Sequence, residues 1–273
     1  SWLTHSGTIH GVPQDWNIWK DIVKKHFIFY EEYIDYIEIW NEPNLDQFMN
    51  LSGSGLTVSQ AYNNLFQYGS EGIKEVNVSV PIGGPVSYRP DDVQLLQDFI
   101  QNEDLVDNIG FISYHVYHSN HGAEPSYTYY QNAMSAAELD VPLFASEWNF
   151  LAQAGSPKNY TSEGIGYIGD TFISYFNGGI GLSAYYNLYE YDNDGDMAFY
   201  TWDEETSTAT LMPQTRAFSI ASVSLGLGAG ESELYSTVGG TGVSTLGAVN
   251  ANGEKIVMLA NPSSSEVSIG VNM

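Results

Sequence analysis

Ile37-Glu38-Ile39-Trp40-Asn41-Glu42-Pro43-Asn44 predicts a short β-strand that stops at a proline, with Glu42 on its last step. A second run, Leu143-Phe144-Ala145-Ser146-Glu147-Trp148-Asn149, predicts another strand with Glu147 at its end. When parallel strands alternate with helices, the loops after the strands build the functional site. The two carboxylates are therefore expected at the same edge of one sheet.

The chain from Ser1 to about residue 190 alternates short β-like runs with amphipathic stretches, the pattern of parallel βα units. Apolar residues recur at helical spacing, and Thr57 is a candidate N-cap. The expected strands are Tyr36–Trp40, Val78–Ile82, Ile109–Tyr114, Leu143–Ser146 and Ile180–Asn187, with one more end at Trp2–Thr4. The expected helices are Asp15–Tyr30, Thr57–Val76, Asp91–Gln101, Ser126–Leu139, Thr161–Asn177 and a last one from Pro213 to about Leu225.

The predicted fold class is α/β, a (β/α)8 TIM barrel that lacks its first two or three βα units. A closed barrel needs eight strands, more than the five or six expected here. From about Glu233 the sequence pattern changes to the apolar-polar alternation of β-strands, which are expected at Val243–Val249, Ile256–Ala260 and Val267–Val271. We therefore expect a barrel domain over 1–228 and a small antiparallel, sandwich-like β-domain over 229–273, which is itself expected to be cut short. A naturally short open sheet is the alternative.

Composition narrows the classes of partner. With a net charge of −25, the chain has too few basic side chains to neutralise phosphate groups. We therefore expect no nucleic acid and no anionic membrane surface as partner. An acidic surface suits high salt, which makes a halophilic or marine source a hypothesis. The aromatic share of 14% fits either a sugar-binding cleft or a β-rich core. With no cysteine in the chain, disulfides and thiolate metal sites are excluded.

Two carboxyl groups that flank a cleft are what hydrolysis of a glycosidic bond requires. A single strand-end glutamate is more often a solvated or capping carboxylate, and Glu38, inside its strand, is interpreted as structural. Two glutamates in matching contexts favour the functional interpretation. No cofactor and no metal are expected. The acidic run at 192–196 lacks the downstream glutamate of a calcium loop and is interpreted as a solvated loop.

The motifs resemble a known family. Trp40-Asn41-Glu42-Pro43-Asn44 resembles the acid/base motif that closes strand four in the large clan of retaining (β/α)8 glycoside hydrolases (clan A). Ser146-Glu147-Trp148-Asn149 resembles its nucleophile motif at strand seven. Gly83-Gly84-Pro85 and Ile112-Ser113-Tyr114-His115-Val116-Tyr117 are similar to the segments found after the intervening strands of family 39, the β-xylosidase and α-iduronidase group.

The resemblance implies a role for each site residue. Glu42 is the implied general acid/base and Glu147 the implied nucleophile, with carboxyl groups about 5–5.5 Å apart as retention requires. Asn41 is implied to bond the sugar 2-hydroxyl. The remaining implied substrate-binding residues are His115, Tyr117, Trp148 and Tyr185. Of these, His115 and Tyr117 are also implied to orient the nucleophile, and Tyr185 stands where the family favours tryptophan.

The expected function is hydrolysis of a β-linked carbohydrate by double displacement, in the manner of a β-xylosidase or β-glucosidase. The alternative is an inactive carbohydrate-binding barrel. A secreted protein is favoured. The sugar, exo or endo action and the oligomeric state are left open by the sequence.

Overall fold

The computed structural model of the chain describes residues 3–88, 93–117, 123–151, 161–188, 197–203, 205–224, 233–236, 242–250, 252–263 and 265–270. The chain forms two compact units. The first unit comprises Ser1–Val116, Ser126–Ser146 and Gly181–Ser183, and the second comprises Tyr117–Pro125, Glu147–Ile180 and Ala184–Met273. Within the described residues, no helix is long and apolar enough to cross a membrane.

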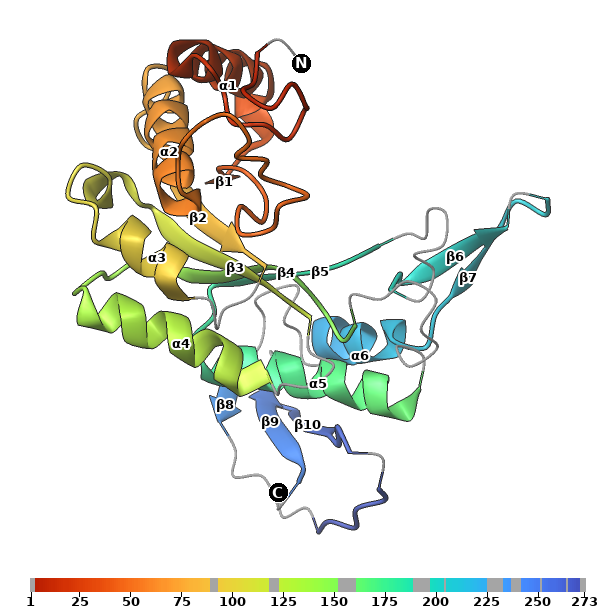
Figure 1. The fold of residues 1–273 in the computed structure, drawn as a ribbon. Coiled ribbons are helices and arrows are strands. Elements are labelled where there is room, and N and C mark those ends of the chain that lie inside the picture. Colours follow the sequence, from red (N-terminus) through yellow and green to blue (C-terminus); the bar gives the residue numbers. More distant parts are fainter. Residues whose placement is uncertain are drawn as a thin grey trace. The chain divides into compact units, whose positions relative to one another are not determined.

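The central sheet has five strands in the order β1-β2-β3-β4-β5 (Figure 1). Neighbours in the sheet are neighbours in the chain, and the pairs β1–β2 and β2–β3 are parallel. This confirms the predicted parallel α/β pattern, because parallel neighbours need a crossover between them. The strands are β1 Ile37–Glu38, β2 Ile82–Ser87, β3 Phe111–Tyr117, β4 Leu143–Asn149 and β5 Leu182–Tyr185.

Three helices, α1, α2 and α5, begin where the sequence predicts, whereas α4 begins at Ala123, three residues before the predicted Ser126. Asp15 caps the first helix by accepting a hydrogen bond from the amide of Asn17, and Thr57 forms a capping box with Gln60. The last helix before β5 is capped by Thr161. The elements are α1 Trp16–Tyr30, η1 Glu31–Tyr33, α2 Val58–Lys74, α3 Val93–Ile100, η2 Val106–Asn108, α4 Ala123–Ala136 and α5 Ser162–Asn177.

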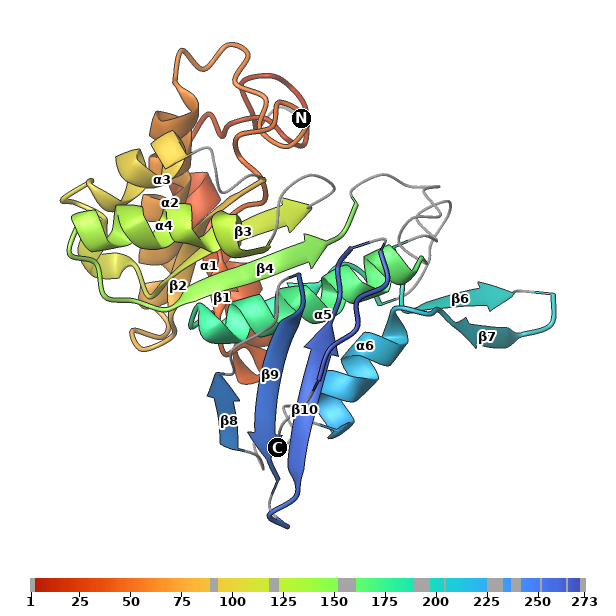
Figure 2. The same ribbon diagram turned by 90° about the horizontal axis from the view of Figure 1, so that it is seen from below.

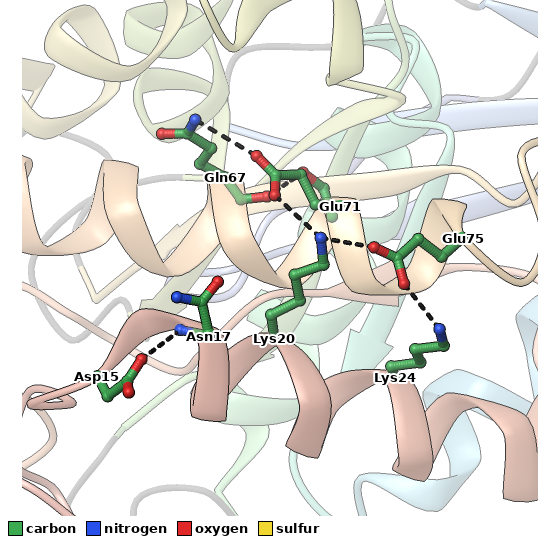
Figure 3. A network of polar contacts seen from close by, with 8 residues as sticks. Asp15, Asn17, Lys20, Lys24, Gln67, Glu71 and Glu75 are labelled. Carbon is green, nitrogen blue, oxygen red and sulfur yellow. Dashed lines mark hydrogen bonds and ion pairs between the residues drawn. The ribbon is translucent and has the colours of Figure 1, made fainter.

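An ion-pair network joins α1 to α2 (Figure 3). Lys20 Nζ lies 2.5 Å from Glu75 Oε1 and 3.4 Å from Glu71 Oε2. Lys24 Nζ lies 2.7 Å from the other oxygen of Glu75. The two helices thus pair opposite charges along their exposed contact, in a chain with eight basic residues in all.

Strand β2 lies later in the sequence than predicted, and its glycines explain the error. The apolar run Val78–Ile82 predicts the strand, but the structure places it at Ile82–Ser87. A Cβ at Gly84 would lie 1.8 Å from the Tyr62 phenol oxygen, and one at Gly83 would lie 2.4 Å from the Phe111 ring. Glycine is required here because large side chains pack directly against the strand.

Other boundaries also move. The strands β3 and β4 extend to Tyr117 and Asn149, so His115, Tyr117 and Glu147 lie within strands and not after them. At the other end of the chain, Thr4 forms an isolated antiparallel bridge with Pro13 instead of ending a parallel strand. The missing first βα units and the boundary between 228 and 229 stay predictions.

The second unit contains a three-stranded antiparallel sheet packed on α5. Its order is β10-β9-β8, with β8 Glu233–Ser236, β9 Ser244–Val249 and β10 Lys255–Ala260. Figure 2 shows α5 crossing β9 and β10, which it contacts. A Cβ at Gly166 would lie 2.1 Å from the Asn261 carbonyl oxygen, so glycine lets the helix approach the sheet. The shared core is Ile173, Leu246, Ala248, Met258 and Ala260.

The C-terminal prediction is partly confirmed. The strands β9 and β10 match the expected ones closely. The third expected strand, Val267–Val271, is wrong over its described residues, because 267–270 form no strand. The hairpin β6 Tyr200–Asp203 with β7 Thr208–Leu211 was not predicted. The helix after Pro213 forms as α6 Thr215–Ser219 and continues as the π-helical segment η4 Ile220–Ser224.

Candidate active site

Glu42 is placed by an unusual backbone path after β1. The segment continues alongside β2, since the amides of Ile39 and Glu42 donate to the carbonyls of Gly83 and Val86 at 3.2 and 3.0 Å. Trp40 and Glu42 have φ angles of 74° and 43°, in the left-handed region. Such a conformation costs about 1–3 kcal/mol for a non-glycine residue and is characteristic of functional sites.

The Glu42 side chain is buried, with 5% of the residue exposed, and its partner is a histidine. His115 Nδ1 lies 2.9 Å from Glu42 Oε1, and His115 is itself 3% exposed. A buried carboxylate requires such a partner to offset its lost hydration. The imidazole can donate or accept a proton at this contact, depending on its tautomer and charge. The structure therefore pairs two predicted site residues, Glu42 and His115.

The rest of the motif is held by its neighbours. Trp40 Nε1 donates to the Phe48 carbonyl at 3.0 Å, and the amide of Tyr88 donates to Asn44 Oδ1 at 2.9 Å. Asn41, between them, is exposed. Exposure suits the predicted contact of Asn41 with a sugar, and that role stays a prediction.

Glu147 lies on β4 and is partly exposed. The phenol of Tyr117 donates a hydrogen bond to Glu147 Oε1. The Tyr117 ring lies edge-on to Tyr186, with centroids 6.4 Å apart and planes at 70°. The structure thus joins Tyr117 to the carboxylate that, by the family resemblance, it is expected to orient.

Trp148 and Tyr185 belong to an aromatic core. Trp148 is 0% exposed and stacks on Phe218, with centroids 6.0 Å apart. Tyr185 stacks on Phe199 at 4.6 Å, and burial raises the pKa of its phenol. Because side chains alternate along a strand, Trp148 points away from the face that carries Glu147. This packing is what a structural role requires, and the predicted contact of both residues with substrate stays a prediction.

Asn149 is a buried residue of this region that the sequence prediction did not include. It is 0% exposed, and its Nδ2 donates to the carbonyls of Tyr186 and Met197. Its Oδ1 accepts from the Phe150 amide at 2.6 Å and the Tyr185 phenol at 3.1 Å. The signal in the sequence is the asparagine two positions after Glu147, which strand alternation places on the same face.

Each carboxylate is thus hydrogen-bonded to a side chain that can exchange a proton, Glu42 to His115 and Glu147 to Tyr117. Glu42 Oε1 and His115 Nδ1, two atoms of the kind that ligate metal ions, are hydrogen-bonded to each other. The expectations of no metal and no cofactor stay predictions. The acidic run 192–196 lies outside the described residues.

Comparison with known proteins gives one family. Residues 6–144 match the family described as glycosyl hydrolases family 39. A β-xylosidase of Geobacillus stearothermophilus is 30% identical over 139 residues, which are 48% of this chain and 26% of that protein. The matched segment contains Glu42, His115 and Tyr117 and ends three residues before Glu147.

Solved structures show the same fold. A monomeric β-xylosidase from Caulobacter crescentus CB15 has a TM-score of 0.65 at 16% identity, over 88% of this chain and 52% of that one. The catalytic domain of the family 30 xylanase C from Talaromyces cellulolyticus has a TM-score of 0.64 at 16% identity, over 89% and 54%. The chain therefore spans about half the length of the solved structures it matches, and about a quarter of the first curated relative.

Proposed function

The chain belongs to glycosyl hydrolases family 39, and we propose that the full-length protein is a retaining glycosidase with Glu42 as acid/base and Glu147 as nucleophile. The observation that carries the proposal is the pair Glu42 and His115. A buried carboxylate, hydrogen-bonded at 2.9 Å to an imidazole, follows a strand of the matched segment on a strained backbone. Such a carboxyl group suits proton transfer to a leaving group.

The first step forms a covalent intermediate. A carboxylate oxygen of Glu147 attacks the anomeric carbon while the protonated carboxyl group of Glu42 gives its proton to the glycosidic oxygen. The bond between that oxygen and the anomeric carbon breaks, and the leaving group departs as a neutral alcohol. The sugar is now an ester of Glu147.

In the second step Glu42, now ionised, takes a proton from water while the water oxygen attacks the anomeric carbon. The ester bond to Glu147 breaks, and the sugar leaves with its original anomeric configuration. The required separation of about 5–5.5 Å between the two carboxyl groups is part of the proposal.

The partners orient the reacting groups. The bond from Tyr117 fixes the rotation of the Glu147 carboxylate, and the bond to His115 fixes that of Glu42. Orientation of this kind is a large part of enzymatic rate enhancement. Asn41 is exposed beside Glu42 and is assigned the sugar 2-hydroxyl.

We propose a β-linked xyloside or glucoside as substrate. Family membership and the names of two relatives, each a β-xylosidase, support this choice. The other candidate is an inactive carbohydrate-binding barrel. The presence of both glutamates, each with a hydrogen-bonding partner, argues for the enzyme.

We further propose that the sheet is the later part of a (β/α)8 barrel whose earlier βα units pack against α1 and β1. Support comes from an apolar groove of about 380 Å³ at this place, lined by residues such as Trp19, Ile22, Phe27 and Ile37. Glu38 lines the same groove, and its Oε1 is buried with no hydrogen-bond partner among the described residues. The solved structures of this fold are about twice as long as the matched part.

The test of function is chemical rescue in the full-length protein. Glu147→Gly should lose turnover of aryl β-xylosides and aryl β-glucosides, and azide should restore it by forming a glycosyl azide of inverted configuration. Wild-type turnover in this variant would remove Glu147 from the mechanism. Sugar binding by the wild-type protein without any turnover would favour the inactive barrel.

A further inference from the structure

The hydrogen bonds of Asn149 saturate a completely buried amide. An asparagine side chain has two N–H donors and one oxygen with two lone pairs. Here both donors meet carbonyl oxygens, those of Tyr186 and Met197. The oxygen receives the Phe150 amide and the Tyr185 phenol. Because the Phe150 amide can only donate, the orientation of the Asn149 amide is fixed.

These bonds connect the end of β4 to two segments that are distant in sequence. The Tyr186 amide donates to the Trp148 carbonyl at 2.9 Å, and the Asn187 amide donates to the Met197 carbonyl at 3.2 Å. Asn149 adds a side-chain bond to Tyr186 and to Met197 from the same strand. The position of Tyr186 relative to β4 is therefore set through both its amide N–H and its carbonyl oxygen.

Tyr186 in turn contacts the partner of the nucleophile. Its ring lies edge-on to Tyr117, with centroids 6.4 Å apart, and the Tyr117 phenol donates to Glu147. The contacts form a closed path from Glu147 through Tyr117, Tyr186 and Asn149 back to β4. Every residue of this path lies in the second unit.

We propose that Asn149 is a positioning residue for the nucleophile. It fixes Tyr186, whose ring limits the position of Tyr117, whose phenol sets the rotation of the Glu147 carboxylate. The inference rests on the proposed function, because it takes Glu147 as the attacking group. The expected consequence is kinetic: a displaced carboxylate slows attack on the anomeric carbon, whereas binding of the sugar changes little.

The central variant is Asn149→Asp in the full-length protein. The shape of the side chain and its acceptor oxygen remain. The NH2 group, which donates to two carbonyl oxygens in the wild type, is replaced by an oxygen that cannot donate to them when ionised. We expect kcat to fall about tenfold to thirtyfold, with KM changed by less than about threefold, as for a small misplacement of a reacting group.

Gln214→Glu is the matched control. Gln214 is also a fully buried amide of the second unit, and its Nε2 donates to the carbonyl of Ala198. The same amide-to-acid change should lower Tm to a similar extent but leave kcat within about twofold of the wild type, since a structural loss alone leaves the reacting groups in place. Equal losses of kcat in the two variants would show general loosening and overturn the proposal.

Tyr186→Ala is the second arm, used because Asn149→Asp can fail to fold. It keeps the carbonyl that Asn149 holds but removes the ring beside Tyr117, so its loss of kcat should resemble that of Asn149→Asp. A wild-type kcat in Tyr186→Ala would break the path and sink the proposal.

A crystal structure of Asn149→Asp, or of Tyr186→Ala where the former does not fold, separates this inference from the proposed function. The bond from Tyr117 to Glu147 should be lost or lengthened beyond 3.5 Å, the usual limit for a hydrogen bond of this kind. An unchanged bond overturns the role of Asn149 whether or not the protein is active. The proposed function would instead be overturned if the wild-type protein showed no turnover and azide restored none in Glu147→Gly.

Discussion

The two catalytic carboxylates of the proposal occupy contrasting environments. Glu42 follows a strand of two residues, on a left-handed backbone, and is buried against an imidazole. Glu147 lies within a regular strand of seven residues, is partly exposed, and accepts a phenol. The difference matches their proposed tasks, because a proton donor gains from burial and a nucleophile must be reachable.

A third carboxylate, Glu75, shows what this arrangement avoids. Two ammonium groups, those of Lys20 and Lys24, hold it ionised and lower its pKa from 4.5 to about 2. A carboxyl group held in this way cannot give up and regain a proton near neutral pH. An imidazole or a phenol orients a carboxylate without holding it permanently ionised. The proposed cycle needs this freedom at Glu42, which must give up a proton and take one back.

The largest effect that distinguishes the two sites is expected from Glu42→Ala. Turnover of substrates with poor leaving groups should fall about 10²–10⁴-fold, the usual contribution of a general acid. Formation of the glycosyl-enzyme from a dinitrophenyl glycoside should be affected much less, since that leaving group needs no proton. The measurement is kcat/KM for a series of aryl glycosides of increasing leaving-group pKa.

Glu147→Gly is the comparison for that series. It should lose activity with every leaving group, because the attacking oxygen is gone. Equal losses across the series in both variants would contradict the division of roles between Glu42 and Glu147.

A smaller effect is expected from Tyr117→Phe, which removes the hydrogen bond to the nucleophile and keeps the ring beside Tyr186. A hydrogen bond to a charged group contributes about 2 kcal/mol, so kcat should fall about thirtyfold. The measurement is kcat on an activated aryl glycoside. Tyr129→Phe on α4, an exposed tyrosine, serves as control. If the two variants retain equal activity, the phenol has no role in orienting Glu147.

The comparison also shows what the sequence could predict. The Trp40–Asn44 motif places Glu42 correctly after β1, because a proline that stops a strand is easily recognised, although β1 itself ends at Glu38, earlier than the predicted Trp40. The caps at Asp15, Thr57 and Thr161 fix helix starts for an equally local reason. Features that depend on neighbouring residues in the chain are therefore well predicted.

Features that depend on distant residues are not. Gly83 and Gly84 contradict strand propensity and form β2 because Phe111 and Tyr62 leave no room for side chains. Trp148 and Tyr185 have the aromatic faces that a sugar contact uses, yet one face of Trp148 stacks on Phe218 and one face of Tyr185 stacks on Phe199. Polarity and aromaticity alone therefore do not separate a site residue from a core residue.

The smallest effect concerns Glu75, the ion-paired contrast to the two site carboxylates. Its folded-state pKa of about 2 lies below the ordinary value of 4.5, so its contribution to stability is present above pH 4.5 and is lost as the pH falls through about 2. Glu75→Gln should therefore lower Tm at pH 7. The shift should be below about 3 °C, because the pair is exposed and screened by water.

Salt separates this local attraction from the repulsion of the whole surface. With a net charge of −25, the wild-type protein should gain stability when salt screens its like charges. The same screening weakens the Lys20–Glu75 and Lys24–Glu75 pairs, so the Tm difference between wild type and Glu75→Gln should shrink as salt rises. Glu32→Gln in η1 removes an equal charge at an exposed position and serves as control. A Tm difference for Glu75→Gln that persists unchanged at pH 2 or in molar salt would mean that packing, and not the ion pairs, holds α1 against α2.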